Sequence, residues 1–259
     1  MIGRAMWMAP ALALVLATAG CETGTADRWI KERLSSTPTA VRVIQIESEQ
    51  PDMRREAVMA VAADRGVRAV PSVVKLFSLV ARTDKDPMVR SAAVRGLVNM
   101  QGDGIADTLG YVLLHDRNQF VRCDAAQALG NRVPPEHADA LAEALRTDAS
   151  GDVRLAAAEA LRQFKDKAAA EALVAAVQDP SIAVAYRSWE GLRYMTGQNL
   201  PREAAAWKQF LAGAENPFAA YGRPPPMPQG ENQRPVLKRG LSDFFSGLFA
   251  KDVRQAELE

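Results

Sequence analysis

Few side chains in this 259-residue sequence stand at spacings that support catalysis or metal binding. Histidine is a common metal ligand and acid–base group, but His115 and His137 lie far apart and neither has a Cys or His neighbour at ligand spacing. The sequence contains no glycine-rich phosphate loop, nucleophile elbow or paired-carboxylate motif. We therefore expect no catalytic residue, metal or cofactor, and we predict that the protein is not an enzyme.

The residue best placed for a chemical modification is Cys21. Arg4 is followed by the apolar run "WMAPALALVLATA", which is shorter than the roughly 20 residues that a membrane span needs. The run ends in "TAGC", which resembles the lipobox of bacterial lipoproteins. That resemblance implies a signal peptide over residues 1–20, cleavage before Cys21, a diacylglyceryl group on its thiol and an acylated amine. Thr18 departs from the pattern, so an ordinary cleaved signal or an uncleaved anchor stays open.

The lipobox resemblance also implies an address. We expect an exported, membrane-anchored lipoprotein of the cell envelope, held by the acyl chains on Cys21. Glu22 stands where some bacteria place the Asp that retains a lipoprotein in the inner membrane, and the choice between inner and outer membrane stays open. Cys123 is then the remaining cysteine, which excludes a disulfide within the mature chain, and we expect it to pack on a helix.

The balance of basic and acidic residues indicates whether the protein binds nucleic acid. Residues 1–20 carry only Arg4, so the remainder has 32 − 1 = 31 basic and 31 acidic residues. Nucleic-acid binding depends chiefly on neutralising phosphates, and we therefore expect no nucleic-acid partner.

The chain is built from an internal repeat. Five segments starting at residues 53, 89, 121, 153 and 184 share one pattern: small residues at the fifth and eighth positions and an aliphatic residue at the ninth. These positions lie on one helical face, where small side chains allow close approach of neighbouring helices. The period of about 32 residues is typical of a solenoid.

A second helix follows in each unit. Apolar pairs four residues apart recur at one offset, with a three-residue shift in the last unit: Val73/Phe77, Leu109/Leu113, Leu141/Leu145, Leu173/Val177 and Trp207/Leu211. Turn-forming residues separate the helices, and Asp116, Asp148 and Asp179 mark the ends of units. Each unit is predicted to be two antiparallel helices, and the stack over residues 49–214 supplies the core.

The phrase "VR..A..AL" resembles HEAT repeats, in the short form called phycobilin-lyase-type HEAT-like repeats. The resemblance implies an all-α fold, an α-solenoid of about five two-helix repeats. It also implies that the Asp before each helix and the Arg of "VR" form ladders between units. The matching residues are Arg54, Arg90, Arg122 and Arg154, with Asp52 and Asp152 directly before their helices, while Ala185 breaks the ladder. A structural role for these arginines and an anion-binding role both stay open.

The ends of the array depart from the repeat. Residues 21–48 are predicted to be a tether and N-terminal capping helices. The fifth unit is rich in aromatic residues, including Trp189 and Trp207, and resembles the closing unit of HEAT-repeat proteins of bacterial envelopes. These aromatic residues either cap the core or form a recognition surface for a partner.

Two segments follow the array. Residues 215–239 are rich in Pro and Gly and are predicted to be an extended linker. Residues 240–259 are predicted to form an amphipathic helix that docks on the solenoid, in a partner's groove or on the membrane. Its apolar stripe consists of Leu241, Phe244, Phe245, Leu248 and Phe249.

Taken together, these features predict a lipid-anchored HEAT-repeat scaffold that binds an unidentified protein partner in the cell envelope, through its concave face or its C-terminal helix. Two alternatives stay open: a HEAT-like lyase- or chaperone-type enzyme that uses the groove, and a purely structural tether.

Overall fold

The structure is a computed structural model that describes residues 43, 45–132 and 138–226. Over these residues the chain is all helical, as the repeat pattern predicts, and contains no strand. The elements, in chain order, are α4 (Pro51–Ala63), the 3-10 turn η1 (Arg65–Val67), α5 (Pro71–Thr83), α6 (Pro87–Leu97), α7 (Ile105–His115), α8 (Gln119–Asn131), α9 (Ala138–Thr147), α10 (Gly151–Leu161), α11 (Lys167–Ala176), α12 (Ile182–Thr196) and α13 (Ala204–Gly213).

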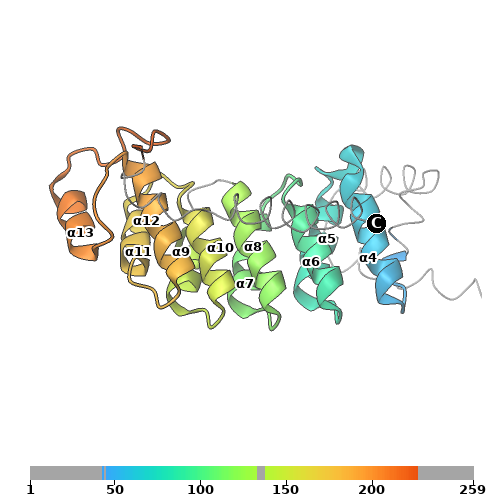
Figure 1. The fold of residues 1–259 in the computed structure, drawn as a ribbon. Helices are drawn as coiled ribbons and strands as arrows, with labels where there is room; N and C mark the ends of the chain where they lie inside the picture. Colours follow the sequence, from blue (N-terminus) through green and yellow to red (C-terminus); the bar gives the residue numbers. More distant parts are fainter. Residues whose placement is uncertain (1–42, 44, 133–137, 227–259) are drawn as a thin grey trace, which may run out of the picture.

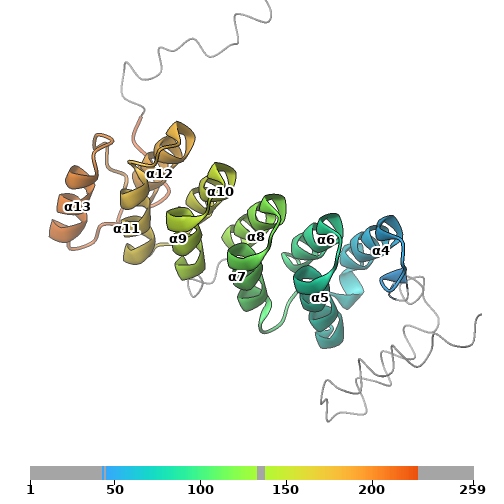
Figure 2. The same ribbon diagram turned by 90° about the horizontal axis from the view of Figure 1, so that it is seen from below.

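The helices form a right-to-left stack of antiparallel pairs (Figure 1). Seen from below, α4, α6, α8, α10 and α12 form one layer, and α5, α7, α9, α11 and α13 form the other (Figure 2). Within a layer each helix packs against the equivalent helix of the next unit, and between the layers the second helix of a unit packs chiefly against the first helix of the unit that follows, as α5 does on α6 and α7 on α8. The prediction of an α-solenoid of five two-helix units is therefore confirmed.

Small residues set the spacing of the first layer. The fifth position of the repeat is fully buried in every unit, at Ala57, Ala93, Ala125, Ala157 and Ser188. A Cβ atom on Gly130 of α8 would lie 2.8 Å from the Cβ atom of Ala160 in α10, so these two helices approach as closely as their backbones allow. The large aliphatic residue at the ninth position fills the space that remains, as at Leu97, Leu129 and Leu161.

The second layer supplies the bulkier part of the core. Phe77, Leu109, Leu113, Leu141 and Leu173 are completely buried at the interface between the layers. A Cβ atom on Gly96 of α6 would lie 2.5 Å from the Cε1 atom of Phe77, so the small residue at this position makes room for the ring. One continuous apolar core runs along the stack, because no two-helix unit can bury its apolar face alone.

Some predicted features fall outside the described residues. These are the signal peptide over 1–20, Cys21, most of the tether and capping segment, and the C-terminal helix with Leu241, Phe244, Phe245, Leu248 and Phe249. At the start of the described chain, Val43 and Ile46 are buried against the first unit. Of the helices that the structure describes, none is long and apolar enough to cross a membrane.

The predicted linker is corrected over its described part. Residues 215–226 do not extend away from the stack but turn back and pack on α12. The hydroxyl of Tyr221 donates hydrogen bonds to the carbonyl oxygens of Arg162 and Gln163, at 3.2 and 2.9 Å. The backbone N–H of Gly222 donates to the carbonyl oxygen of Tyr194 at 2.9 Å. The aromatic side chain of Tyr221 holds this Pro- and Gly-rich segment in place as a cap.

Candidate functional site

Four arginines of the first layer join the units through ion pairs. Each guanidinium lies near the start of its helix and binds an aspartate at the end of the same unit with two parallel hydrogen bonds. For Arg122 and Asp148 the Nε–Oδ2 and Nη2–Oδ1 distances are 2.7 and 2.9 Å. The four pairs are Arg54–Asp84, Arg90–Asp116, Arg122–Asp148 and Arg154–Asp179. We call this set the ladder.

A second contact makes the ladder continuous. The Nη1 atom of each arginine donates to the backbone carbonyl oxygen of the residue six positions earlier, which for Arg90 is Asp84, at 2.9 Å. Asp84 therefore accepts from Arg54 through its carboxylate and from Arg90 through its carbonyl group. The same carboxylate accepts the backbone N–H of Asp86, which begins the next helix. Asp84, Asp116 and Asp148 each link two arginines in this way, and each fixes the turn between two units.

The carboxylates of the ladder differ from those expected from the sequence. Asp52 and Asp152 were predicted from their place directly before the "VR" phrase, but both lie in the first turns of their helices and are exposed. Asp52 pairs with Arg55 on the surface at 3.1 Å. The physical reason is that the guanidinium extends toward the inter-unit turn, where only a carboxylate at the end of the unit reaches both of its nitrogen atoms. A spacing signal was present, because Asp84, Asp116 and Asp148 each precede the next ladder arginine by six residues.

The ladder ends in neutral residues. At the N-terminal end Ser48 occupies the aspartate position: its hydroxyl oxygen accepts from the N–H of Gln50, and its carbonyl oxygen accepts from Arg54. At the other end Ala185 occupies the arginine position, where the sequence predicts a break, and Asp179 receives only Arg154 as its guanidinium partner. Four arginines therefore meet four aspartates with no charge left over. This closed pairing supports a structural role for the arginines.

The ladder also sets the electrostatics of its aspartates. Burial of Asp148 disfavours its charged form, but the hydrogen bonds from Arg122 and from the N–H of Ser150, with the charges of Arg122 and Arg154, hold the pKa of Asp148 below its ordinary value. The pKa of Asp84 and that of Asp179 are lowered by the same balance of burial and arginine contacts. These carboxylates stay ionised at neutral pH and bind their arginines.

Trp189 and Trp207 close the core. Their side chains are 1% and 0% exposed, and their indole N–H groups donate to the carbonyl oxygens of Leu200 and Pro201 at 2.8 and 2.9 Å. The guanidinium of Arg193 lies 4.7 Å from the ring of Trp189 and donates to the carbonyl oxygens of Pro225 and Pro226. The sequence left two roles open for these tryptophans, and the structure shows that they cap the core. Their candidate partner-binding role is wrong, because both side chains are buried.

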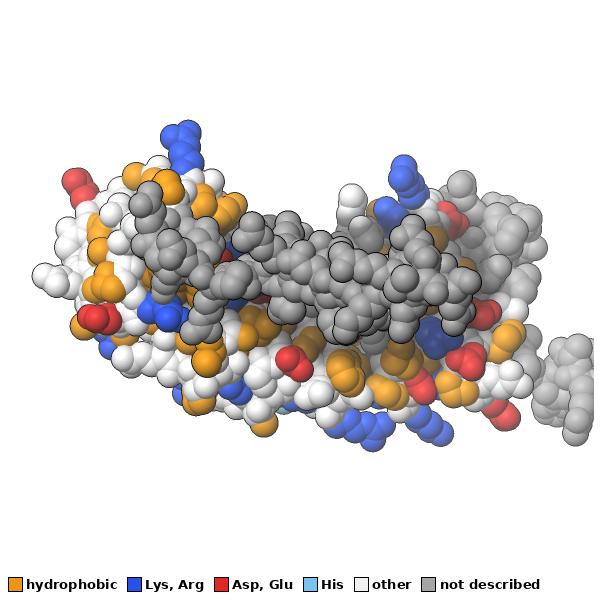
Figure 3. All heavy atoms as spheres, viewed as in Figure 1, with side chains coloured by type: hydrophobic (Ala, Val, Ile, Leu, Met, Phe, Trp, Pro, Cys, Tyr) orange, Lys and Arg blue, Asp and Glu red, His pale blue; other side chains and the backbone are white. Residues whose placement is uncertain are grey.

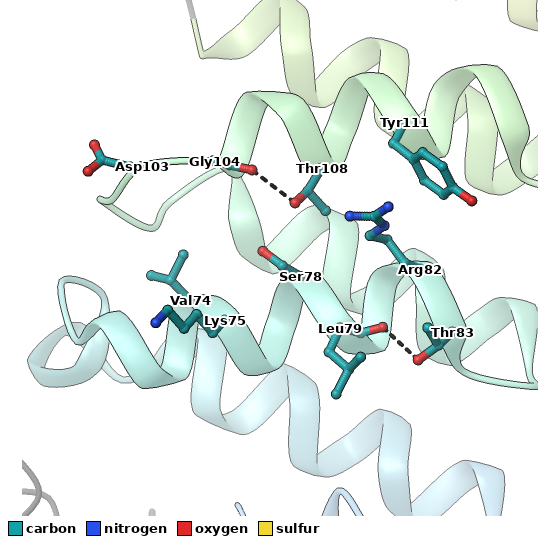
Figure 4. Close-up of a pocket in the computed structure, with 10 residues that line it drawn as sticks. All are labelled: Val74, Lys75, Ser78, Leu79, Arg82, Thr83, Asp103, Gly104, Thr108 and Tyr111. Carbon is teal, nitrogen blue, oxygen red and sulfur yellow. Dashed lines mark hydrogen bonds between the residues drawn. The ribbon is translucent and has the colours of Figure 1, made fainter. Parts of the chain in front are cut away.

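The surface of the second layer carries a hollow of about 530 Å³ between α5 and α7. We call it the α5–α7 groove (Figure 4). Its walls are Val74, Lys75, Ser78, Leu79, Arg82 and Thr83 from α5, Asp103 and Gly104 from the turn before α7, and Thr108 and Tyr111 from α7. The guanidinium of Arg82 crosses the groove and lies 4.0 Å from the centre of the Tyr111 ring, a cation–π contact between neighbouring units.

Exposed hydrophobic side chains are concentrated on the helices from α5 to α8, and two of them, Leu79 and Tyr111, line the groove. Five of the eight large hydrophobic residues exposed over the described chain are Leu79, Met88, Tyr111, Leu114 and Phe120, all from α5 to α8. In the space-filling view, hydrophobic and basic side chains lie side by side along the lower edge beneath α5 and α6 (Figure 3). Isolated exposed apolar residues are ordinary, but exposed apolar side chains that line one groove, as Leu79 and Tyr111 do, are typical of a binding surface.

The described residues give little support for a metal site or for a reactive cysteine. No group of three or more His, Cys, Asp or Glu side chains in that part of the chain is arranged to hold a metal ion. Cys123 is half-buried on α8, and burial, followed by the charges of Asp152, Asp124 and Asp148, raises the pKa of its thiol to about 11. The thiol is therefore protonated and unreactive at neutral pH, in keeping with the packing role expected of it.

Comparison with known proteins gives a family for the repeats. The family model for HEAT repeats matches residues 39–130, 106–193 and 138–211, which overlap to span most of the chain. No curated protein matches the chain. Two solved structures with similarity are crystal structures of engineered proteins. They share 20% and 21% sequence identity with this chain, cover 68% and 61% of it and 90% and 78% of their own chains, and have TM-scores of 0.46 and 0.41.

Proposed function

This chain belongs to the HEAT-repeat family, and from that premise we propose that it is a lipid-anchored scaffold that binds a protein partner in the bacterial cell envelope. Stacked repeats form extended surfaces that such proteins use for binding. The repeat supplies shape rather than chemistry, so the binding site must be sought where surface side chains depart from what packing requires.

The α5–α7 groove with its apolar surroundings is the observation that carries the proposal. Tyr and Arg are enriched in protein interfaces, and they are among the residue types that supply most of the binding energy. Tyr111 and Arg82 are of these types, and both line the groove, Arg82 from α5 and Tyr111 from α7. The groove is open and long enough to receive side chains from a partner segment that lies along α5 and α7.

The charges in the groove indicate what the partner segment contains. Lys75 and Arg82 are both exposed on α5. The guanidinium of Arg82 stacks on the ring of Tyr111. A partner side chain that brings a carboxylate to the Arg82 guanidinium gains charged hydrogen bonds. An apolar side chain beside it contacts Leu79 and Val74 on the wall of the groove.

The lipid anchor rests on Cys21 and the residues before it. A hydrophobic run with one basic residue, ending in small residues and a cysteine, supports lipidation at Cys21. More than one acyl chain is needed for stable membrane attachment, and the lipoprotein modification supplies them. Mass spectrometry of the exported chain tests this part directly, because a Cys21→Ser variant is expected to lose the acyl mass and leave the membrane fraction.

Site-specific cross-linking tests the groove. A photoreactive residue placed at Leu79 of the full chain is expected to give one discrete cross-linked species in cells, and Tyr111→Glu is expected to remove it. The same residue at Met59 is the matched control, because Met59 is 58% exposed but lies on α4, away from the groove. A structural tether would give no discrete species at either position, and equal cross-linking at both positions would contradict a binding role for the groove.

A further inference from the structure

The turns between units form one edge of the solenoid, at the bottom of Figure 1. We call it the loop edge: the turns ending in Asp86, Asn118, Ser150 and Ser181 and the first helical turns that follow them. In the repeat, two exposed positions of this edge lie five and two residues before the ladder position. Where the residue types at these two positions differ among the five units, the fold itself does not specify them.

Units two and three differ from the others at both positions. Five residues before the ladder position the units have Glu49, Lys85, Arg117, Ala149 and Pro180. Two residues before it they have Asp52, Met88, Phe120, Asp152 and Ala183. Only two adjacent units therefore present a cation together with a large apolar side chain, and Met88 and Phe120 are 50% and 66% exposed.

Packing does not account for these four residues. Units one, four and five adopt the same turns with acidic, small or proline residues at the same places. The structure instead fixes the two cations near each other, because Nη2 of Arg117 donates to the carbonyl oxygen of Lys85 at 3.0 Å. The surface is thus assembled across the junction of two units.

The charge of this part of the edge is positive. Asp84 and Asp116 are bound by Arg54 and Arg90 of the ladder. The carboxylate of Asp86 accepts the backbone N–H groups of Met88 and Val89 at the start of α6. Asn118, at the equivalent position of unit three, is neutral.

We propose that this part of the loop edge rests on an anionic membrane surface. Lys85 and Arg117 bind lipid phosphates, and Met88 and Phe120 enter the boundary between headgroups and acyl chains. The inference rests on the lipid anchor of the proposed function. Two cations and two apolar side chains bind a membrane weakly by themselves, but an anchored chain keeps them at high effective concentration. The contact orients the solenoid and leaves the α5–α7 groove beside the membrane.

Quenching of tryptophan fluorescence by brominated lipids tests this contact. The full chain is made with an N-terminal histidine tag and Cys21→Ser, and is held on vesicles by a nickel-chelating lipid. Because this tether replaces the acyl chains, the result does not depend on whether Cys21 is modified in cells. The reporters are Phe120→Trp and the control Met59→Trp, whose positions are similarly exposed at 66% and 58%, and the native tryptophans contribute equally to both.

On vesicles of brominated phosphatidylcholine and phosphatidylglycerol, we expect at least about threefold more quenching at Phe120→Trp than at Met59→Trp. The difference is expected to fall to the control level with Lys85→Glu and Arg117→Glu together, with phosphatidylglycerol omitted, or at high salt, which screens exposed charges. Met88→Ser, which keeps the charges, is expected to reduce it in part. Equal quenching of the two reporters, or quenching unaffected by the charge reversal, overturns the proposal and leaves the edge as a surface for an acidic protein.

Discussion

Replacing Arg122 by Met tests the ladder at its centre. The change removes the two hydrogen bonds to Asp148, at 2.7 and 2.9 Å, and the one to the carbonyl oxygen of Asp116, at 2.9 Å. It leaves the Asp148 carboxylate, whose side chain is 8% exposed, with the backbone N–H of Ser150. Breaking a buried ion pair by removing one partner costs about 3–5 kcal/mol. We expect a loss of about 3 kcal/mol in the free energy of unfolding, at the low end of this range, because the Arg122 side chain is 15% exposed to water.

Urea unfolding followed by far-UV circular dichroism measures this loss. The matched control is Arg146→Met, which breaks the pair with Glu143 on the neighbouring helix α9, where the side chains are 69% and 43% exposed. Exposed pairs contribute about 0–1 kcal/mol, so the control should hardly move the urea midpoint. If Arg122→Met and Arg146→Met shift the midpoint equally, the ladder does not hold the units together in the way described.

The same variant has a predicted pH dependence. The pKa of Asp148 is lowered in the folded protein, so its contribution to stability is present above its unfolded pKa of about 3.9 and is lost as pH falls through the folded value. The stability difference between the original chain and Arg122→Met should therefore be full at neutral pH and shrink in acid below about pH 4. A difference that stays constant down to pH 2 would show that the charge on Asp148 is not involved.

Three further predictions concern the core and the cysteine. Leu129→Ala should cost roughly 2–5 kcal/mol by leaving a cavity, and Ala157→Leu should cost roughly 1–3 kcal/mol by overpacking, both read from urea midpoints. If both changes are neutral, the packed columns of the repeat are misassigned. Gly130→Ala should also destabilise by roughly 1–3 kcal/mol, since its Cβ atom would lie 2.8 Å from that of Ala160, and unchanged stability would show that α8 and α10 separate freely. Alkylation of Cys123 at pH 8 should be roughly 100-fold slower in the folded than in the urea-unfolded chain, because burial raises its pKa to about 11, and equal rates would contradict that burial.

The architecture could be predicted because the repeat makes the same physical demand five times. Ala57, Ala93, Ala125 and Ala157 must be small for the helices to approach, and such a column is visible without coordinates. The arginine side of the ladder was visible for the same reason. The aspartate side was assigned to the wrong residues, because nearness in sequence was used where the pairing crosses a whole two-helix unit, as in Arg90 and Asp116.

Contacts between a helix and an irregular segment could not be predicted. Arg193 donates to the carbonyl oxygens of Pro225 and Pro226, and Tyr221 to those of Arg162 and Gln163. Proline- and glycine-rich composition favours an extended chain, and it carries no periodic signal to show where the chain turns back. Surface features such as the exposed Met88 and Phe120 could not be predicted either, because the sequence does not show which apolar side chains are exposed.

The neutral ends of the ladder make an internal unit interchangeable. Deleting residues 117–148 would remove Arg122 and Asp148 as a pair, along with helices α8 and α9. Asp116 would then stand six residues before Arg154, in the relation that Asp148 now has to it. The shortened chain keeps every remaining arginine matched, because each of the first four units carries both members of its own ion pair. A gene encoding such a protein can therefore lengthen or shorten by whole units through duplication and loss, with electrostatic neutrality preserved at each step.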